Sequence, residues 1–587
     1  MLPDDLLLGV RKPGQYIGEE WNVSRKDFDA AGVKFCLCFP DLYEVGMSNL
    51  GLRILYGVLN ERSDVVCERC FAPAPDMEAL LRKEKAPLYS LESGKPLADF
   101  DIIGFSLGYE LCYTNILAML ELAGIPLRTA QRDRHHPLVI AGGPAALNPE
   151  PVADFFDAVI IGEAEEAVLE ALEEYRRQER GFKKGAVSRK ELLFALSQVK
   201  GVYVPSLYDV TYAADGSIES FVPKEKGVPQ KVQKRFIGDL DASFFPVDWL
   251  VPNVSIVHDR LSLEVMRGCP NRCRFCQARS QYYPLRTRKP KSVVGLADAL
   301  YRATGYEELS LLGLSVSDYP GLAEVVRPLI ERFRPEGISV SIPSVKPRTI
   351  LSELAGLIAT IKKTGLTFAP EAATARMRSI IGKDFDEAEF FNTLAQAFGA
   401  GYQHVKLYFM IGLPFESETD LEDILDFSCR VSELRRGITK RPAQVNVSVN
   451  TLIPKPHTAF QWFGMLEQDA MRAKQQSIRE KNRNRSIRLS FHDPAMSFLE
   501  GVFSRGDRRL SAVIEAAFRK GCRLDAWGEH LRFDFWLEAF SQCGIEPGLY
   551  LKEKALEELL PWDFIDTGVS RDFLVEEYQK VKDPAPL

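Results

Sequence analysis

The sequence predicts an α/β protein built on two parallel sheets and completed by a helix-rich carboxyl-terminal region. Three observations support this fold class. Short apolar runs alternate with amphipathic helical patterns in two separate parts of the 587-residue chain, as expected for parallel sheets covered by helices. An irregular, polar stretch at residues 179–255 separates these two parts. From residue 466 onward the pattern is mostly helical, with no repeat of solenoid period.

Residues 30–178 are predicted to form the first domain, after an amino-terminal arm of residues 1–29. Each strand-like run in this domain is followed by a turn, and most of these turns lead into a helical pattern. The alternation predicts a Rossmann-like, doubly wound domain, and open sheets of this kind bind ligands at the carboxyl ends of their strands. The predicted strands lie in the runs VKFCLCF (33–39), FDIIGFS (100–106), PLVIAGG (137–143) and DAVIIG (157–162).

Residues 179–255 are predicted to be a linker that contains a small β element. An Asp-Gly turn at Asp215 and Gly216 lies between two alternating runs within residues 202–222, which is a β-hairpin pattern. The remainder of the stretch is polar, contains proline and shows no periodicity.

The second α/β part, residues 256–465, contains six strand-like runs separated by helical patterns. Six such βα units predict a partial TIM barrel of the (β/α)6 type, with its site at the carboxyl ends of the strands. Residues 466–587 are predicted to form the helical carboxyl-terminal region. The predicted barrel strands are 261–266, 309–315, 339–344, 366–370, 404–412 and 445–453.

The composition excludes some classes of function. Hydrophobic residues make up 46% and charged residues 26% of the chain, which is the usual balance of a globular protein. The net charge of −7 gives no general attraction to nucleic acid or to anionic membranes. No apolar run approaches the roughly 18 residues of a membrane-spanning helix, and the first residues do not resemble a secretory signal. We therefore expect a cytoplasmic protein without membrane association.

Three of the eleven cysteines, Cys269, Cys273 and Cys276, lie within eight residues of one another. In a cytoplasmic protein such a group indicates a metal site rather than disulfides. Three thiolates from one loop can bind three irons of a cubane cluster and leave the fourth iron open. A structural zinc ion would need a fourth protein ligand, and the nearest histidine, His258, lies eleven residues upstream. An iron–sulfur cluster is therefore favoured, with zinc as the alternative.

The cysteine motif also resembles the signature of a known superfamily. Cys-x3-Cys-x2-Cys after a strand, with Phe275 just before the last cysteine, resembles the motif of the radical S-adenosylmethionine (SAM) superfamily. Four later stretches resemble, in order, further motifs of that superfamily. They are LLGLSVSDY (311–319), LTFAPEAATARMRSIIGK (366–383), YFMIGLPFESETDLED (408–423) and NTLIPKPHTAFQW (450–462).

This resemblance implies a cofactor set and a reaction class. The three cysteines of the loop would hold a 4Fe-4S cluster, and SAM would bind the open iron. One electron from the cluster would cleave SAM to a 5′-deoxyadenosyl radical that modifies a substrate, and we expect an electron donor of flavodoxin or ferredoxin type. No catalytic acid or base is singled out. The implied SAM contacts are Phe275, Gly313, Ser315, Ser317, Glu371 and Arg378.

The first predicted domain resembles the cobalamin-binding-type domain that precedes the radical core in one branch of the superfamily. The resemblance lies in VIAGGPAALNPEPVADFFDAVIIGEAEEAV (139–168), with its Gly-Gly and Gly-Glu turns, and in Ser106 at the sheet edge. Glycines in these turns would let the backbone approach a bulky planar ligand closely. This branch implies methyl transfer or a related carbon-centred radical modification.

One position departs from the pattern of that branch. Many cobalamin domains carry Asp-x-His-x-x-Gly, whose histidine binds cobalt, whereas this chain has Tyr43 in the histidine place. Tyrosine, with a pKa of about 10, is a poor replacement for a neutral imidazole. Either cobalamin binds without a protein histidine on its cobalt, or the domain has become a scaffold or a platform for the substrate. The cobalamin contacts implied by the resemblance are Asp41, Tyr43, Gly46, Ser106, Gly142, Gly143, Gly162 and Glu163.

Two basic segments near the carboxyl terminus leave other functions open. Residues 471–489 carry seven Lys or Arg and one acid, consistent either with an RNA-binding face or with the solvent face of an amphipathic helix. The segment SRGDRR (504–509) would either clamp an anionic substrate or cap a helix with ion pairs. Two alternatives therefore remain. One is an RNA-modifying radical SAM enzyme of methylthiotransferase type without cobalamin, and the other is a non-catalytic protein that binds zinc and RNA.

Overall fold

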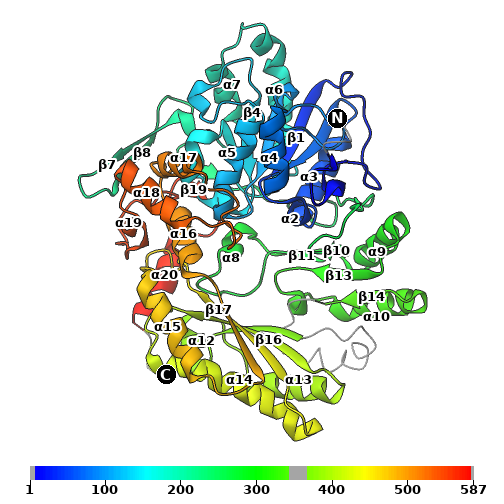
Figure 1. Cartoon of the computed structure of the whole chain (residues 1–587), viewed down its shortest axis with the longest axis vertical. Helices are drawn as coiled ribbons and strands as arrows, with labels where there is room; N and C mark the ends of the chain where they lie inside the picture. Colours follow the sequence, from blue (N-terminus) through cyan, green and yellow to red (C-terminus); the bar gives the residue numbers. More distant parts are fainter. Residues whose placement is uncertain (1–6, 343–365, 584–587) are drawn as a thin grey trace.

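The amino-terminal domain is built on one sheet in the computed structural model, which describes residues 7–342 and 366–583 (Figure 1). Its strands are β1 (Val33–Phe39), β2 (Val65–Phe71), β3 (Ile102–Ser106), β4 (Leu138–Gly142), β5 (Ala158–Ile160) and β6 (Val202–Tyr203). The strand order is β2-β1-β3-β4-β5-β6, with β6 antiparallel and the others parallel. This order reverses between β1 and β3, as in flavodoxin-like sheets. The predicted doubly wound fold is confirmed.

Strand β2 was not predicted because its sequence, VVCERCF, has two charged residues at its centre. All seven of its residues are nevertheless buried. Arg69 pairs with Glu20 of the amino-terminal arm at 2.9 Å and with Glu92 at 2.6 Å. These partners compensate the buried charge, and they are visible only in the tertiary structure.

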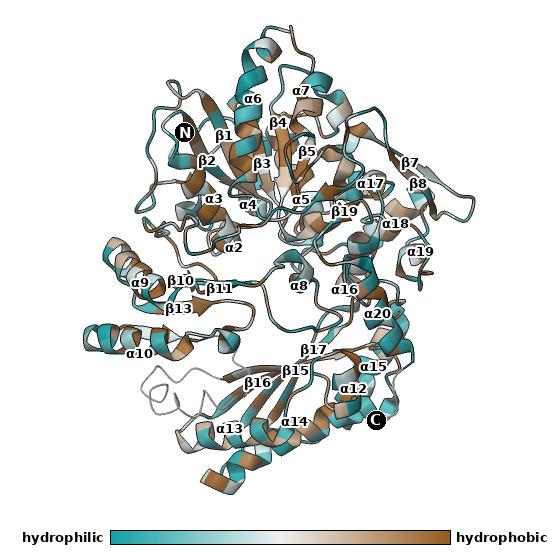
Figure 2. Ribbon diagram, turned by 180° about the vertical axis from the view of Figure 1, so that it is seen from behind, coloured by the Kyte–Doolittle hydropathy of each residue, from teal (hydrophilic) through white to brown (hydrophobic). Residues whose placement is uncertain are grey.

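Helices cover both faces of this sheet, and in Figure 2 its brown strands contrast with the largely teal helix α6 (Ala167–Lys183). Helix α3 begins after Asn49, whose side chain accepts a hydrogen bond from Leu52 N at 2.9 Å, the usual stabilisation of a helix start. The helices of this part are α2 (Tyr43–Gly46), α3 (Leu50–Asn60), α4 (Pro75–Glu84), α5 (Tyr113–Leu122), α6 (Ala167–Lys183) and α7 (Arg189–Leu196).

The first domain extends beyond the predicted boundary at residue 178, because β6 pairs with β5 of its sheet. The remainder of the predicted linker contains the predicted hairpin. Strands β7 (Tyr208–Tyr212) and β8 (Ile218–Pro223) pair antiparallel around the Asp-Gly turn. Farther on, β9 (Val232–Gln233) pairs in parallel with β19 (Ile565–Asp566), close to the end of the chain. The linker is therefore fastened to the carboxyl-terminal region.

The barrel part contains two parallel sheets within the described residues, β10-β13-β14 and β15-β16-β17-β18. The strands are β10 (Leu261–Glu264), β11 (Met266–Arg267), β12 (Arg286–Thr287), β13 (Glu308–Leu312), β14 (Ser339–Ser341), β15 (Leu366–Glu371), β16 (His404–Ile411), β17 (Gln444–Thr451) and β18 (Ile487–Phe491). A strand occurs at each of the six predicted positions, although the end of predicted strand 339–344 lies outside the described residues. The predicted partial barrel is confirmed.

Two details of the barrel differ from the prediction. The predicted strand 261–266 is divided, because β10 ends at Glu264 and β11 pairs antiparallel with β12 instead. Strand β18 pairs with β17 and so extends the barrel sheet beyond the predicted boundary at residue 465. Its alternate residues, such as Arg488, are exposed, which is why the segment was included in a basic helical pattern. The helices of this part are α8 (Gln277–Gln281), α9 (Pro290–Thr304), α10 (Leu322–Phe333), α12 (Ala375–Ile380), α13 (Glu387–Gly399) and α14 (Glu418–Thr439).

The carboxyl-terminal region is rich in helices, as predicted, and it packs on the first domain as well as on the barrel. Helix α17 contacts α5 of the first domain. The helices are α15 (Gln468–Lys481), α16 (Pro494–Arg505), α17 (Leu510–Lys520), α18 (Phe533–Cys543), α19 (Gly548–Leu551) and α20 (Arg571–Lys582). No helix within the described ranges is long and apolar enough to cross a membrane.

The arginines of the basic segment SRGDRR have partners within the protein, which favours the ion-pair alternative over an anion clamp. Arg505 is 1% exposed and donates to backbone carbonyl oxygens, including those of Tyr550 at 2.7 Å and Phe463 at 2.9 Å. Arg508 pairs with Glu150 at 2.9 Å. These side chains fasten the carboxyl-terminal region to its neighbours, in agreement with the ion-pair alternative.

Two Lys side chains of the other basic segment, residues 471–489, also have acidic partners. On α15, Lys474 pairs with Glu416 at 3.0 Å and Lys481 pairs with Glu422 at 2.6 Å. The RNA-binding alternative for this face remains a prediction, and these pairs reduce the positive charge that it would present.

Candidate active site

The cysteine loop connects β11 to α8, and the chain then continues to β12. Gly268 begins the loop with a φ of +92°, and an added Cβ would lie 2.7 Å from Tyr282 O and 2.9 Å from Pro284 O. Glycine is required here because a side chain would collide with the returning segment. The loop carries three half-buried cysteines, Cys269, Cys273 and Cys276. The local fold therefore holds the three predicted ligands on one short turn.

The turn after β13 lies against the cysteine loop. Asn271 Nδ2 donates to Cys269 Sγ at 3.2 Å and to Asp318 Oδ2 at 2.9 Å. Ser315 Oγ donates to the same oxygen of Asp318 at 2.7 Å. Ser317, on the same turn, is buried. The turn that carries two predicted SAM contacts is thus beside the cluster loop, and the contacts themselves remain predictions.

The carboxyl end of β15 contributes a charged pair near the loop. Glu371 Oε1 lies 2.9 Å from Lys383 Nζ, and Glu371 has a φ of +64°, which is uncommon for a residue with a side chain. Burial raises the pKa of Cys276, and the positive charge of Lys383 acts in the opposite direction. Lys383 closes the predicted stretch 366–383, but its proximity to the cysteines was not deducible from the sequence.

Two other predicted SAM contacts are held by protein partners. Arg378 is 2% exposed and donates to Ala373 O at 2.7 Å and to Glu387 at 3.0 Å. Its guanidinium lies over the ring of Phe385, 4.5 Å from the centroid. Phe275 packs against an apolar cluster shared by the barrel and the carboxyl-terminal region. For both residues the SAM contact remains a prediction, and the structure gives each of them a packing role.

The donor set of the loop suits a 4Fe-4S cluster. In such a cluster each cysteine sulfur binds a different iron, and three thiols on one loop can bind three of the four irons. A structural zinc ion usually has four protein ligands, and the loop supplies three cysteines.

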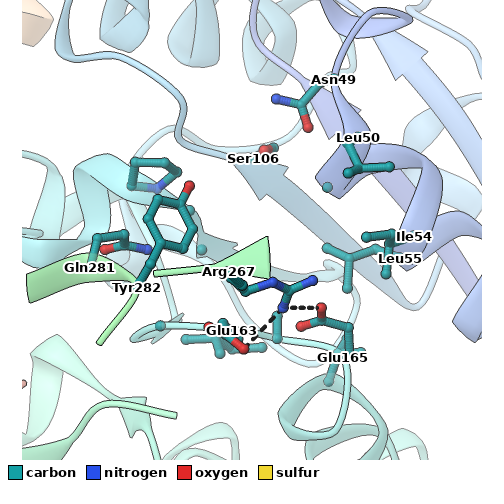
Figure 3. Close-up of a pocket in the computed structure, with 18 of the residues that line it drawn as sticks. Asn49, Leu50, Ile54, Leu55, Ser106, Glu163, Glu165, Arg267, Gln281 and Tyr282 are labelled. Carbon is teal, nitrogen blue, oxygen red and sulfur yellow. Dashed lines mark hydrogen bonds and ion pairs between the residues drawn. The ribbon is translucent and has the colours of Figure 1, made fainter. Parts of the chain in front are cut away.

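A cavity of about 380 Å³ lies between the first domain and the segment that carries the cysteine loop (Figure 3). Its first wall is formed by α3 and by the carboxyl-terminal parts of β1, β3, β4 and β5, and it includes Leu37, Leu50, Ile54, Gly104, Ser106 and Ile140. Its second wall includes Met266, Arg267, Gln281, Tyr282 and Gly313. The cavity therefore touches the predicted cobalamin region on one side and the predicted SAM region, at Gly313, on the other.

The predicted cobalamin contacts divide into two groups. Five of them line the cavity, namely Ser106, Gly142, Gly143, Gly162 and Glu163. The lining, as far as the described residues define it, does not include Asp41, Tyr43 or Gly46. Tyr43 is 2% exposed and donates its hydroxyl to Glu20 at 3.0 Å, while Asp41 accepts from Trp527 Nε1 at 2.9 Å. Tyr43 and Asp41 therefore form hydrogen bonds within the protein, away from the cavity lining.

Two glycines of the cavity are required by the protein's own backbone, and the expectation that these turns admit a ligand remains a prediction. An added Cβ on Gly143, whose φ is +116°, would lie 2.8 Å from Leu107 O. An added Cβ on Gly162 would lie 2.3 Å from Arg235 O. Both positions need glycine because loops of the protein itself approach closely there.

A buried ion-pair network forms the floor of the cavity. Arg267, in the centre of Figure 3, lies 2.9 Å from Glu163 and 2.7 Å from Glu165, both in the first domain. It also pairs with Glu264 at 2.9 Å. Burial would raise the pKa of Glu163, but hydrogen bonding to Arg286 and the charges of both arginines lower it below its ordinary value. This network was not predicted, because its first-domain carboxylates and its barrel arginines lie more than 100 positions apart in the chain.

Family models agree with this site. The model described as the radical SAM superfamily matches residues 263–428, and the model for the N-terminal part of radical SAM proteins matches residues 51–205. The chain belongs to the radical SAM superfamily. It is therefore an enzyme, and the superfamily implies a 4Fe-4S cluster and SAM as cofactors. The alternative of a non-catalytic zinc protein is not supported.

Two curated proteins are similar in sequence. Uncharacterized protein MJ0966 of Methanocaldococcus jannaschii is 26% identical over 517 residues, which cover 88% of this chain and 98% of that protein. The tRNA-2-methylthio-N(6)-dimethylallyladenosine synthase of Chlorobium phaeobacteroides is 28% identical over 139 residues, which cover 23% of this chain and 31% of that protein.

Solved structures with a similar arrangement include two radical SAM enzymes. The methyltransferase TsrM from Kitasatospora setae, with cobalamin and a 4Fe-4S cluster bound, has a TM-score of 0.47 at 13% identity, covering 71% of this chain and 72% of its own. OxsB, with aqua-cobalamin and SAM bound, has a TM-score of 0.43 at 13% identity, covering 94% of this chain and 79% of its own.

Proposed function

We propose that this radical SAM enzyme holds a corrinoid, of the cobalamin type, in the cavity between its first domain and its cysteine loop, and that it transfers a methyl group to its substrate. The observation that carries the proposal is the position of the cavity. It joins the carboxyl ends of a flavodoxin-like sheet, where such sheets bind ligands, to the segment that carries the three cysteines.

The lining of the cavity suits such a ligand chemically. Between α3 and the sheet the lining is apolar, with Leu50, Ile54 and Ile140, and it can receive an aromatic group. Toward the barrel it becomes polar, with Arg267 and Gln281, and it can meet the amide groups of a corrin rim. None of the seven histidines of the chain, all within the described residues, lies in the lining. A cobalt in this cavity would therefore have no histidine of the protein as a ligand.

The chain's own residues have definable tasks in this proposal. The loop at Cys269, Cys273 and Cys276 would hold the cluster, which supplies the electron for SAM cleavage when it is bound. Ser315 and Asp318 fix the turn beside the loop through a hydrogen bond of 2.7 Å. With a corrinoid bound, the apolar residues of the first wall would exclude water from that side of the cavity. We further propose a small flavodoxin or ferredoxin as the electron donor.

A paired substitution at Ser106 tests this function. Ser106 is at the end of β3 and lines the cavity, so Ser106→Phe would fill space that the corrinoid needs. The purified, anaerobically reconstituted protein is incubated with hydroxocobalamin, and unbound corrinoid is removed by gel filtration. We expect cobalt in Ser106→Phe to fall at least about tenfold, with iron and sulfide unchanged. Ser106→Ala, which adds no volume, should retain cobalt.

The result that would refute the proposal is equally specific. If the wild-type protein retains its cluster but binds no cobalt, the cavity does not hold a corrinoid. If Ser106→Phe and Ser106→Ala bind the same amount of cobalt as the wild type, the corrinoid lies at another position.

A further inference from the structure

The cysteine loop has a narrow neck formed by the two short strands β11 and β12. These strands pair antiparallel, and their register places Arg267 directly opposite Arg286. The residues between them, 268–285, contain the three cysteines and α8. The two arginines therefore stand side by side at the point where the cluster loop leaves the barrel and returns to it. Their side chains are largely buried, at 8% and 7% exposure.

A single carboxylate of the first domain binds both of these arginines. Glu163 Oε2 accepts from Arg267 Nη1 at 2.9 Å and from Arg286 Nη1 at 2.8 Å, and Glu163 Oε1 accepts from Arg286 Nη2 at 2.7 Å. Ile237 N also donates to Glu163 Oε2 at 2.8 Å. Among the ion pairs of the described residues, Glu163 is the one carboxylate shared by the two arginines.

The charges of the neck show why this carboxylate matters. Two adjacent guanidinium groups repel each other, and burial strengthens the repulsion. Arg267 has further carboxylate partners in Glu264 and Glu165. The other hydrogen bonds of Arg286 go to backbone carbonyl oxygens, those of Pro284, Tyr282 and Ile237. Without Glu163, the hydrogen-bond partners of Arg286 would all be neutral carbonyl groups. Its buried positive charge would then lie next to that of Arg267 without a carboxylate to compensate it.

Arg286 also holds the segment that returns to the neck. It donates to Pro284 O at 2.9 Å and to Tyr282 O at 3.0 Å. This segment passes so close to Gly268 that a Cβ added there would lie 2.9 Å from Pro284 O and 2.7 Å from Tyr282 O. Gly268 is followed directly by Cys269. Glu163 and Arg286 therefore hold the segment that packs over the start of the cysteine loop.

We propose that Glu163 is a positioning residue for the iron–sulfur cluster. By binding Arg267 and Arg286 together, it keeps the neck of the cysteine loop closed and places the loop relative to the first domain. This role differs from the cobalamin contact that the sequence suggested. This role presupposes the 4Fe-4S cluster that the radical SAM superfamily implies, and it does not depend on a corrinoid in the cavity.

The test uses Glu163→Gln in the full chain, with Glu166→Gln as the control. Glu166 lies in the same turn but pairs with Arg235, outside the neck. After anaerobic reconstitution, cluster loss is followed as iron release to a chelator, and the reduced cluster is examined by electron paramagnetic resonance. We expect Glu163→Gln to lose iron about tenfold faster than the wild type and to give an altered resonance spectrum. Glu166→Gln should match the wild type in both measurements.

A second variant separates positioning from stability alone. Glu163→Gln combined with Arg286→Met removes the uncompensated charge, so we expect thermal stability to recover toward that of the wild type. The neck stays unfastened, so iron loss should remain fast. Two results would overturn the proposal. One is a Glu163→Gln variant with the wild-type rate of iron loss and the wild-type spectrum. The other is a double variant in which the rate of iron loss and the spectrum return to wild-type values together with the thermal stability.

Discussion

At the scale of single residues, burial and partners decide roles that the sequence pattern leaves open. The resemblance to cobalamin domains puts Tyr43 in the place of a cobalt-binding histidine. In the structure its hydroxyl donates to Glu20 and its ring packs edge-on against Phe71, 5.2 Å between centroids. Glu20 in turn compensates Arg69 inside the first sheet. Because these groups are buried together, Tyr43 belongs to a network that stabilises the domain.

Substitution of Tyr43 should therefore affect stability and leave corrinoid binding unchanged. Tyr43→Phe removes a hydrogen bond to a charged carboxylate, at a cost of about 1.5–3 kcal/mol. We expect a lower thermal midpoint of unfolding and an unchanged dissociation constant for hydroxocobalamin, measured by absorption titration. Weaker binding of hydroxocobalamin at an unchanged thermal midpoint would instead place Tyr43 at the ligand.

At the scale of elements, the carboxyl-terminal helices complete the first domain. Asp525 precedes α18 and accepts hydrogen bonds from Thr114 of α5 at 2.6 Å and from Trp536 of α18 at 3.0 Å. It is fully buried between these helices. This carboxyl group therefore joins two elements from opposite ends of the chain.

The burial of Asp525 makes the contact between these elements depend on pH. Burial raises its pKa to about 6, above the ordinary value of about 3.9. Between these two pKa values the folded protein binds more protons than the unfolded chain. The stabilising contribution of Asp525 to the free energy of unfolding is therefore complete below about pH 4 and is lost as the pH rises through 6. The difference of about two pKa units corresponds to about 3 kcal/mol.

Asp525→Asn, which is neutral at every pH, is the comparison for this prediction. The midpoint of thermal unfolding of Asp525→Asn relative to the wild type should be higher at pH 8 than at pH 5. A difference between the two proteins that stays constant from pH 5 to pH 8 would contradict a raised pKa at this position.

At the scale of the whole molecule, local patterns predicted the elements, and tertiary contacts determined the site. The alternation of apolar runs and helices predicted both parallel sheets, and the spacing of the three cysteines predicted the cluster loop. The pairing of Glu163 with Arg267 and Arg286 was not predictable, since these residues are separated by 104 and 123 positions. Strand β2 was missed for the same reason, because Glu20 and Glu92 compensate Arg69 only in the folded chain.

The cavity is also a property of the whole molecule. One wall comes from the first domain and the other from the barrel, so neither part forms it alone. The sequence placed Ser106, Gly142 and Glu163 in one predicted site and Gly313 in another. The fold brings both predicted sites to the same cavity, which is the basis of the proposed cobalamin-dependent function.

Anomalous X-ray diffraction at the iron and cobalt absorption edges tests this account most directly. Crystals would be grown without oxygen from protein reconstituted with iron, sulfide, SAM and hydroxocobalamin. We predict an iron signal at Cys269, Cys273 and Cys276 and a cobalt signal in the cavity between Ser106 and Arg267. A zinc signal at the cysteines, or iron at the cysteines with no cobalt in the cavity, would contradict the account.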